Sequence, residues 1–180
     1  LNAGIINSNN CKTNSNDGKE FHSENYYLND ELNNNNRRET MNVEVKNLPG
    51  YRVAYVRVLQ GYKHEYISKA FDKIIKWAGA RELINDKTLV IGISYDDPKI
   101  THPDKCRYDA CVTVAHDIKP EGEIGVKEIK PGKYAVYRIE SIYTAGVNDD
   151  FGKFWDELYR IWLPSSGYQP DDRDCFEIYY

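Results

Sequence analysis

Two stretches of the sequence repeat one pattern, and this repetition constrains the fold more than any other feature. "NVEVKNLPGYRVAYVRVLQ" and "IGVKEIKPGKYAVYRIE" each predict a strand, a Pro-Gly pair and a second strand, because alternating Val and Tyr are typical of strands. Pro49-Gly50 and Pro131-Gly132 lie 82 residues apart, and Tyr55 and Tyr137 share that offset. The sequence therefore predicts a duplicated unit.

A helix is predicted after each of these stretches. In "EYISKAFDKIIKWAGA" apolar residues recur at helical spacing, and Gly79 is the expected end. In "NDDFGKFWDELYRIWLP" Asn148 or Asp149 is the expected cap and Pro164 the expected end. The residues expected to face inward from this second helix are Phe151, Phe154, Trp155, Leu158 and Ile161.

The helices belong to the same duplication, since Phe71-Asp72 matches Trp155-Asp156 at an offset of 84 residues. Further strands are predicted in "KTLVIGISYDD", "CRYDACVTVAHD" and "CFEIYY". One unit has an apolar sheet face and a single main helix, so two units would share a core. We therefore expect an α+β fold with two pseudo-repeated strand-helix-strand-strand units. They would form an antiparallel, mainly eight-stranded sheet with one main helix per half and a ligand cleft between the halves.

The first 40 residues differ in composition from the rest. Residues 1–40 contain 12 Asn and residues 41–180 contain 4, and the first region lacks apolar periodicity. We expect residues 1–40 to be a linker or tail and residues 41–180 to be the folded domain; a short helix in "FHSENYYLND" is the alternative within the tail. Because the sequence begins with Leu1 and not with Met, we expect it to be a fragment of a longer protein.

Composition excludes several classes of protein. The net charge of -4 and the pI near 5.6 argue against a nucleic-acid-binding face in this chain. No apolar run approaches the roughly 18 residues of a membrane span, so no membrane contact is expected. The four cysteines are sparse and unevenly spaced, which favours reduced thiols in the cytoplasm over a disulfide framework.

The spacing of the candidate metal ligands and the absence of common catalytic motifs argue against a metal site or a familiar catalytic site. His102, Cys106, Cys111 and His116 could suggest zinc, but alternation along a strand turns Cys111 away from Cys106 and His116. The sequence has no Gly-x-Ser-x-Gly elbow, phosphate loop or His-Glu-x-x-His motif. We therefore expect no metal and no cofactor.

Several segments in a fixed order resemble a known family. They are "LPGYRVAYVRVLQGY", "IGISYDDP", "CRYDACVTV", "KPGKYAVYRIESIY", "FWDELYRIWLPSSGY" and "FEIYY". Together they are similar to the GyrI-like small-molecule-binding domain, which is also the C-terminal effector-binding domain of many AraC-type transcription regulators. The resemblance covers about residues 42–180 and agrees with the duplication derived above.

The resemblance implies a role for Glu177. In this family a glutamate of the last strand lies in the pocket between the halves and faces cationic, aromatic ligands, and the matching residue here is Glu177. Without the resemblance, a solvated glutamate on an edge strand is the simpler interpretation. Tyr95, Tyr108, Tyr137 and Trp162 are the further candidates for ligand contacts, although each could instead be core. Phe71, Ile74, Trp77, Trp155 and Leu158 are assigned to the core.

The resemblance also implies a function. We expect a domain that binds a small cationic or aromatic effector for a bacterial transcription regulator, without catalysis of its own. DNA would be bound only by an upstream domain, and homodimerisation is left open. The alternative is a stand-alone GyrI-like protective protein, which either hydrolyses cyclopropane-type genotoxins with Glu177 as base or inhibits a protein such as DNA gyrase.

Overall fold

The computed structural model describes residues 2–7, 42–139 and 151–180. Eight strands form one sheet in the order β2-β7-β1-β8-β4-β5-β3-β6, with helices beside it, which confirms the predicted α+β class. The strands are β1 (Asn2–Asn7), β2 (Val43–Leu48), β3 (Tyr51–Val58), β4 (Val90–Ser94), β5 (Tyr108–Thr113), β6 (Gly125–Ile129), β7 (Gly132–Ile139) and β8 (Phe176–Tyr179).

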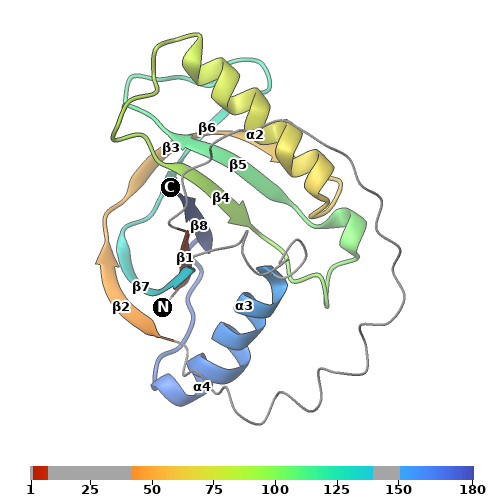
Figure 1. Ribbon diagram of the computed structural model, residues 1–180, viewed down its shortest axis with the longest axis vertical. Coiled ribbons are helices and arrows are strands. Elements are labelled where there is room, and N and C mark those ends of the chain that lie inside the picture. Colours follow the sequence, from red (N-terminus) through yellow and green to blue (C-terminus); the bar gives the residue numbers. More distant parts are fainter. Residues whose placement is uncertain (1, 8–41, 140–150) are drawn as a thin grey trace, which may run out of the picture.

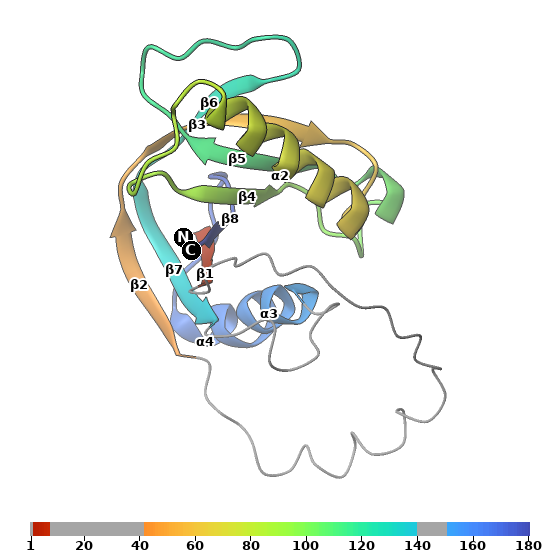
Figure 2. The same cartoon turned by 45° about the horizontal axis from the view of Figure 1, so that its top comes forward.

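The two Pro-Gly pairs are corners between the halves of the sheet, not hairpin turns. β2 pairs with β7 and β3 pairs with β6, both antiparallel, so each Pro-Gly pair carries the chain from one half to the other. The corners touch, because a Cβ on Gly50 would lie 3.1 Å from Cδ of Pro131. The bent sheet in Figures 1 and 2 follows from these two crossings.

The bend divides the apolar residues into three clusters. The inter-half core lies on one face of the sheet and takes residues from both halves: Val53, Ile91, Ile93, Cys111, Ile129, Tyr134, Val136, Phe176 and Ile178. On the other face, α2 (His64–Gly79) covers β3 and β5 through Ala70, Ile74 and Ala78. The second-half helices pack on β7 through Leu158 and Ala135. Helices therefore line one face of the sheet (Figure 2).

The first helix follows its sequence pattern. α2 ends at Gly79 as predicted, and Ile74 and Ala78 of its apolar stripe are fully buried. A short 3-10 turn, η1 (Pro103–Lys105), precedes β5. Of the helices in the described residues, none has both the length and the apolar character that a membrane crossing requires.

The second helix departs from its prediction at two places. It is composed of α3 (Phe151–Glu157), a π-helical turn η2 (Leu158–Trp162) and α4 (Leu163–Ser166). Pro164 does not end it; the helix continues to Ser166 and stops at Gly167, which has a left-handed φ of 73°. Ile161 does not face inward, being 68% exposed, while Trp162 packs on the second-half core. The wide π turn shifts the helical face by about one residue. The predicted caps, Asn148 and Asp149, lie outside the described residues.

Strand β1 was not predicted. It lies in the Asn-rich region and pairs in parallel with both β7 and β8. The other residues of that region, including the alternative helix in "FHSENYYLND", lie outside the described residues. The division into residues 1–40 and 41–180 therefore stays a prediction.

The repeat is out of phase by one residue at the corners. β3 begins at Tyr51, after its corner glycine, whereas β7 begins at the glycine itself, Gly132. A shift of one residue exchanges the faces of a strand. Tyr55 therefore packs on the inter-half core, while Tyr137 lies on the helix face against Phe154 at 5.8 Å between ring centroids.

The corner at Gly132 generates a stability prediction. Its φ is 151°, and a Cβ there would lie 1.6 Å from a terminal nitrogen of Arg173. That guanidinium donates to the carbonyl oxygens of Pro131 (3.3 Å) and Lys133 (3.1 Å). We expect Gly132→Ala to lower the free energy of unfolding by about 1–3 kcal/mol through backbone strain and displacement of Arg173. Urea unfolding measures the change.

Gly79→Ala is the matched control. A Cβ at Gly79, the last residue of α2, would meet nothing within 4 Å, so this variant should be as stable as the wild type or slightly more so. Equal stability of the Gly132→Ala variant and the wild type would contradict the assignment of Gly132 as a strained corner.

Candidate functional site

Glu177 lies near the centre of the sheet with its side chain on the helix face. Phe176 and Ile178 point into the inter-half core, so alternation along β8 directs Glu177 and Tyr179 toward the helices. The Glu177 residue is only 5% exposed. The solvated edge-strand interpretation is therefore wrong, because β8 is an interior strand and its glutamate is buried.

Three neutral side chains donate hydrogen bonds to the Glu177 carboxylate. The hydroxyls of Tyr179 and Tyr108 reach Oε2 at 2.6 Å and 3.2 Å, and the indole N–H of Trp155 reaches Oε1 at 3.1 Å. The two phenol oxygens are 3.1 Å apart. Phe71 of α2 packs edge-on against both tyrosine rings, with centroids 6.1 Å from Tyr108 and 5.6 Å from Tyr179. An aromatic cage surrounds the carboxylate.

Gly92 makes room for this arrangement. It is the register partner of Glu177 on β4, and a Cβ there would lie 1.8 Å from the Tyr108 hydroxyl and 3.0 Å from Oε2 of Glu177. Any larger residue would displace the phenol. A glycine inside a buried strand is otherwise unfavourable, so its presence marks a place where another group approaches the backbone.

Burial raises the pKa values of the ionisable side chains in the cage. It raises the pKa of Glu177, and the hydrogen bonds from Tyr179, Trp155 and Tyr108 only partly oppose that shift. It also raises the pKa of Tyr108 and of Tyr179 well above the usual value, so both stay protonated and act as donors. No cationic side chain among the described residues forms an ion pair with Glu177.

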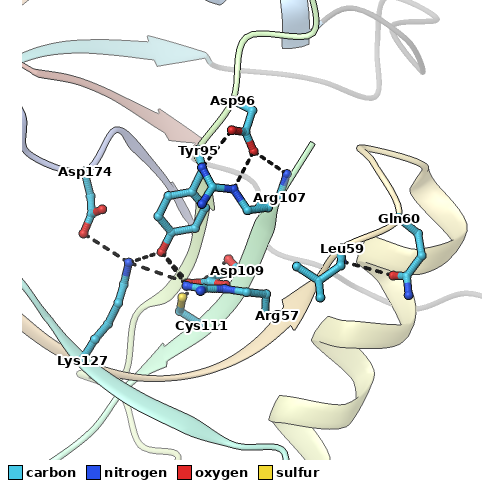
Figure 3. Close-up of polar contacts among 10 residues, drawn as sticks. All are labelled: Arg57, Leu59, Gln60, Tyr95, Asp96, Arg107, Asp109, Cys111, Lys127 and Asp174. Atoms are coloured by element: carbon cyan, nitrogen blue, oxygen red, sulfur yellow. Dashed lines mark hydrogen bonds and ion pairs between the residues drawn. The ribbon is translucent and has the colours of Figure 1, made fainter. Parts of the chain in front are cut away.

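The second buried carboxylate, Asp109, contrasts with Glu177. It follows Tyr108 on β5, so alternation along the strand places it on the opposite face. Figure 3 shows Asp109 and the residues around it. Arg57 binds both of its oxygens, at 2.7 Å and 2.8 Å, and the Lys127 amine lies 3.7 Å away. The Tyr95 hydroxyl donates to it at 2.5 Å. Protein cations compensate Asp109, whereas the hydrogen-bond partners of Glu177 among the described residues are all neutral.

The structure brings together some of the predicted site residues but not all. Glu177 and Tyr108 are in contact. Tyr95 lies on the opposite face in the Asp109 cluster, with Arg57, Arg107 and Lys127 within 5.3 Å of its ring centroid.

The other two candidates lie on the helix face of the second half. Tyr137 packs on Phe154, and Trp162 stacks on Tyr168 at 6.4 Å between centroids with a 14° interplanar angle. Ligand contact by Tyr95, Tyr137 and Trp162 stays a prediction.

Sequence reasoning missed four members of the site: Phe71, Gly92, Trp155 and Tyr179. Two signals could have found some of them. Tyr179 is two residues from Glu177 on the same strand face. Phe71 and Trp155 match in the repeat, and the structure places them on two sides of Glu177. Both were assigned to the core because apolar spacing does not distinguish a buried ring from one that lines a cage.

Known proteins resemble this chain over most of its length. The family described as a GyrI-like small molecule binding domain matches residues 41–180. A DNA gyrase inhibitor of Yersinia enterocolitica is 33% identical over 132 residues, which are 71% of this chain and 79% of the relative. A protein of Bacillus subtilis, named as a candidate transcriptional regulator derived from prophage SPbeta, is 28% identical over 71% of this chain and 84% of its own length.

Solved structures share the fold. The C-terminal domain of EcmrR matches with a TM-score of 0.54 and 16% identity, over 73% of this chain and 79% of that domain. EcmrR in a complex with DNA matches with a TM-score of 0.53 over 73% of this chain and 47% of the EcmrR chain. At this identity the match shows the arrangement of strands and helices alone.

The uncompensated burial of Glu177 predicts a dependence of stability on pH. Below the unfolded-state pKa, about 4.3, both states carry a protonated carboxyl. Above it, the unfolded state ionises freely while burial opposes ionisation in the folded state, so the charge progressively destabilises the fold. Glu177→Gln should therefore be more stable than the wild type at about pH 7.5, by on the order of 1 kcal/mol, with the difference vanishing toward about pH 4. Urea unfolding at the two pH values measures this.

Asp109→Asn should behave in the opposite way. It removes the negative partner of Arg57 and Lys127 and should destabilise the protein at about pH 7.5 by roughly 1–3 kcal/mol. If Glu177→Gln also destabilised the protein at that pH, the Glu177 carboxylate would be well compensated, and the contrast between Glu177 and Asp109 would be wrong.

Proposed function

Because this chain belongs to the GyrI-like small molecule binding domain family, we propose that it senses a cationic, aromatic small molecule at Glu177 as the effector-binding part of a transcription regulator. The observation that carries the proposal is the aromatic cage itself. A buried carboxylate is unfavourable unless a cation accompanies it, and the described residues supply only neutral donors. A cationic ligand would provide the missing charge.

The cage suits a flat cation. Aromatic faces attract a cation by about 0.5–2 kcal/mol each when the site is desolvated, and this attraction does not depend on the detailed shape of the ligand. Tyr108, Tyr179, Phe71 and Trp155 surround the carboxylate from β5, β8, α2 and α3. Breadth of ligand choice would follow from stacking, and the preference for positive charge from Glu177.

Trp155 is the donor that a ligand would replace. Two phenols share Oε2, whereas the indole is the donor to Oε1 among the described residues. Trp155 is half-buried on α3, while Tyr108 is enclosed in the first-half core. A cation at Oε1 would therefore displace the indole N–H and exchange a neutral hydrogen bond for a charge-assisted one, which is stronger.

The link to transcription rests on relatives. One relative carries the name of a transcriptional regulator, and the fold matches the C-terminal domain of EcmrR, a protein that has been solved in a complex with DNA. We infer that residues 41–180 report ligand occupancy to a DNA-binding domain upstream. The ligand must then bind the active arrangement of the regulator better than the inactive one.

A second candidate function has its own support. Several relatives at 30–33% identity are named DNA gyrase inhibitors, so this chain could act on a protein without any ligand. Purified chain in a DNA gyrase supercoiling assay tests that role. Hydrolysis of a cyclopropane-bearing alkylator by Glu177 is the enzymatic variant, and product formation that Glu177→Gln abolishes would identify it.

Cation binding should depend on the ionised state of Glu177. We expect planar cationic dyes to bind by calorimetry and matched neutral analogues to bind at least about tenfold more weakly. Because burial raises the pKa of Glu177 and a cation favours the carboxylate, affinity should fall as the pH is lowered through that pKa, with proton release on binding. Glu177→Gln should lose about 10- to 100-fold in cation affinity and all of this pH dependence.

Two further variants sharpen this experiment. Glu65→Gln removes an exposed carboxylate of α2 and should leave affinity unchanged. Trp155→Phe keeps an aromatic ring but removes the indole donor, so it should bind cations as tightly as the wild type or more tightly. Equal affinity for cations and neutral analogues, or full retention of cation binding in Glu177→Gln, would reject the carboxylate site.

A further inference from the structure

Helix α3 is tied to the first half of the molecule by an ion pair. The Asp156 carboxylate binds the amine of Lys99, which lies in the turn that follows β4. Asp156 also accepts a hydrogen bond from Arg160, one turn later in its own helix, at 3.2 Å. The Lys99 amine, together with Arg160, keeps the pKa of Asp156 below its usual value, so this carboxylate is charged at neutral pH. The pair therefore joins α3, from the second half, to a turn of the first half (Figures 1 and 2).

The turn that carries Lys99 is held close to the aromatic cage. Asp96 precedes it and accepts two hydrogen bonds from the guanidinium of Arg107, at 2.8 Å and 2.9 Å. The Tyr62 hydroxyl donates to the carbonyl oxygen of Asp96 at 2.7 Å. The ring of Tyr62 packs edge-on against Tyr108, with 6.2 Å between ring centroids. Lys99 is thus anchored to the wall of the cage that comes from the first half.

On the other side of the ion pair, Asp156 directly follows Trp155 of the cage. The Trp155 indole donates to Oε1 of Glu177 at 3.1 Å, and its ring packs on Tyr159 at 6.1 Å between centroids. Of the α3 residues whose burial the structure describes, none is fully buried. A segment with so little burial is displaced at low cost, so each contact that remains affects its position.

Building on the cation site proposed above, we propose that Lys99 and Asp156 are positioning residues for Trp155. Their ion pair holds the indole on Oε1 of Glu177, the oxygen that the cation would take. Binding then requires the indole to move against this restraint, so the pair lowers cation affinity and selects ligands that bind strongly enough to displace Trp155. The ligand shifts the position of α3 by its difference in affinity for the two arrangements, and the ion pair sets the starting balance.

This positioning effect is distinct from an effect of local charge. Lys99→Met and Asp156→Asn both break the ion pair, although they change the local charge in opposite directions. An effect of charge alone would strengthen cation binding in Lys99→Met and weaken it in Asp156→Asn. Positioning predicts tighter binding in both variants, by about two- to fivefold, since exposed ion pairs make modest contributions.

The first measurement needs no ligand. The full chain is isotope-labelled on nitrogen, and NMR follows the indole N–H signal of Trp155, which is identified by its loss in Trp155→Phe. We expect this signal to shift, and its exchange with water to accelerate, in Lys99→Met and in Asp156→Asn. Lys99→Arg keeps the charge and should retain the wild-type signal. The Trp77 indole, which donates to Glu121 at 3.2 Å, is the internal control and should stay unchanged.

The second measurement is calorimetry with a planar cationic dye. Lys99→Met and Asp156→Asn should each bind the dye more tightly than the wild type, and the double variant should bind it no more tightly than either single variant. Lys69→Met removes an exposed lysine of α2 and should match the wild type.

An unchanged Trp155 signal in both single variants would overturn the inference, as would dye affinities that are unchanged or that move in opposite directions. If the Trp155 signal moves but none of the proteins binds the dye, the cation site is rejected and the positioning of Trp155 by the ion pair stands.

Discussion

The arrangement of the site depends on one unfavourable interaction, the burial of the Glu177 carboxylate among neutral hydrogen-bond donors. Tyr108, Tyr179 and Trp155 come from two strands and a helix, and each is oriented by its bond to the same group. Satisfying the carboxylate without neutralising it keeps the protein folded while preserving an attraction for positive charge.

The two buried carboxylates, Glu177 and Asp109, lie on opposite sides of strand β5 and have different hydrogen-bonding and ionic partners. Tyr108 on one face faces Glu177, and Asp109 on the other face is bound by Arg57 and Lys127. Lys127 also pairs with Asp174 at 3.2 Å, in the segment that leads into β8. The compensated cluster thus fixes the strand that carries the uncompensated glutamate. The compensated Asp109 cluster, shown in Figure 3, and the Glu177 cage thus lie on opposite faces of one sheet.

Periodicity and turn residues were sufficient to predict the duplication, the α+β class and the first helix with its end at Gly79. They could not predict the exchange of strands at Pro49-Gly50, because local turn chemistry does not specify which strands pair across a sheet. The π turn that exposes Ile161 leaves a sequence pattern indistinguishable from a regular helix. Trp155 was taken for core since its indole partner is 22 residues away in sequence.

The site arises where the two halves differ. Gly92 and Glu177 are register partners on the two central strands, β4 and β8, so the repeat offers two neighbouring positions for a side chain. A glutamate at both would bring two like charges together in a buried place, and one would have to stay protonated. Glycine on one strand and glutamate on the other gives a single carboxylate and the space for Tyr108 above the backbone. The two similar halves thus differ at the place where the proposed ligand site lies.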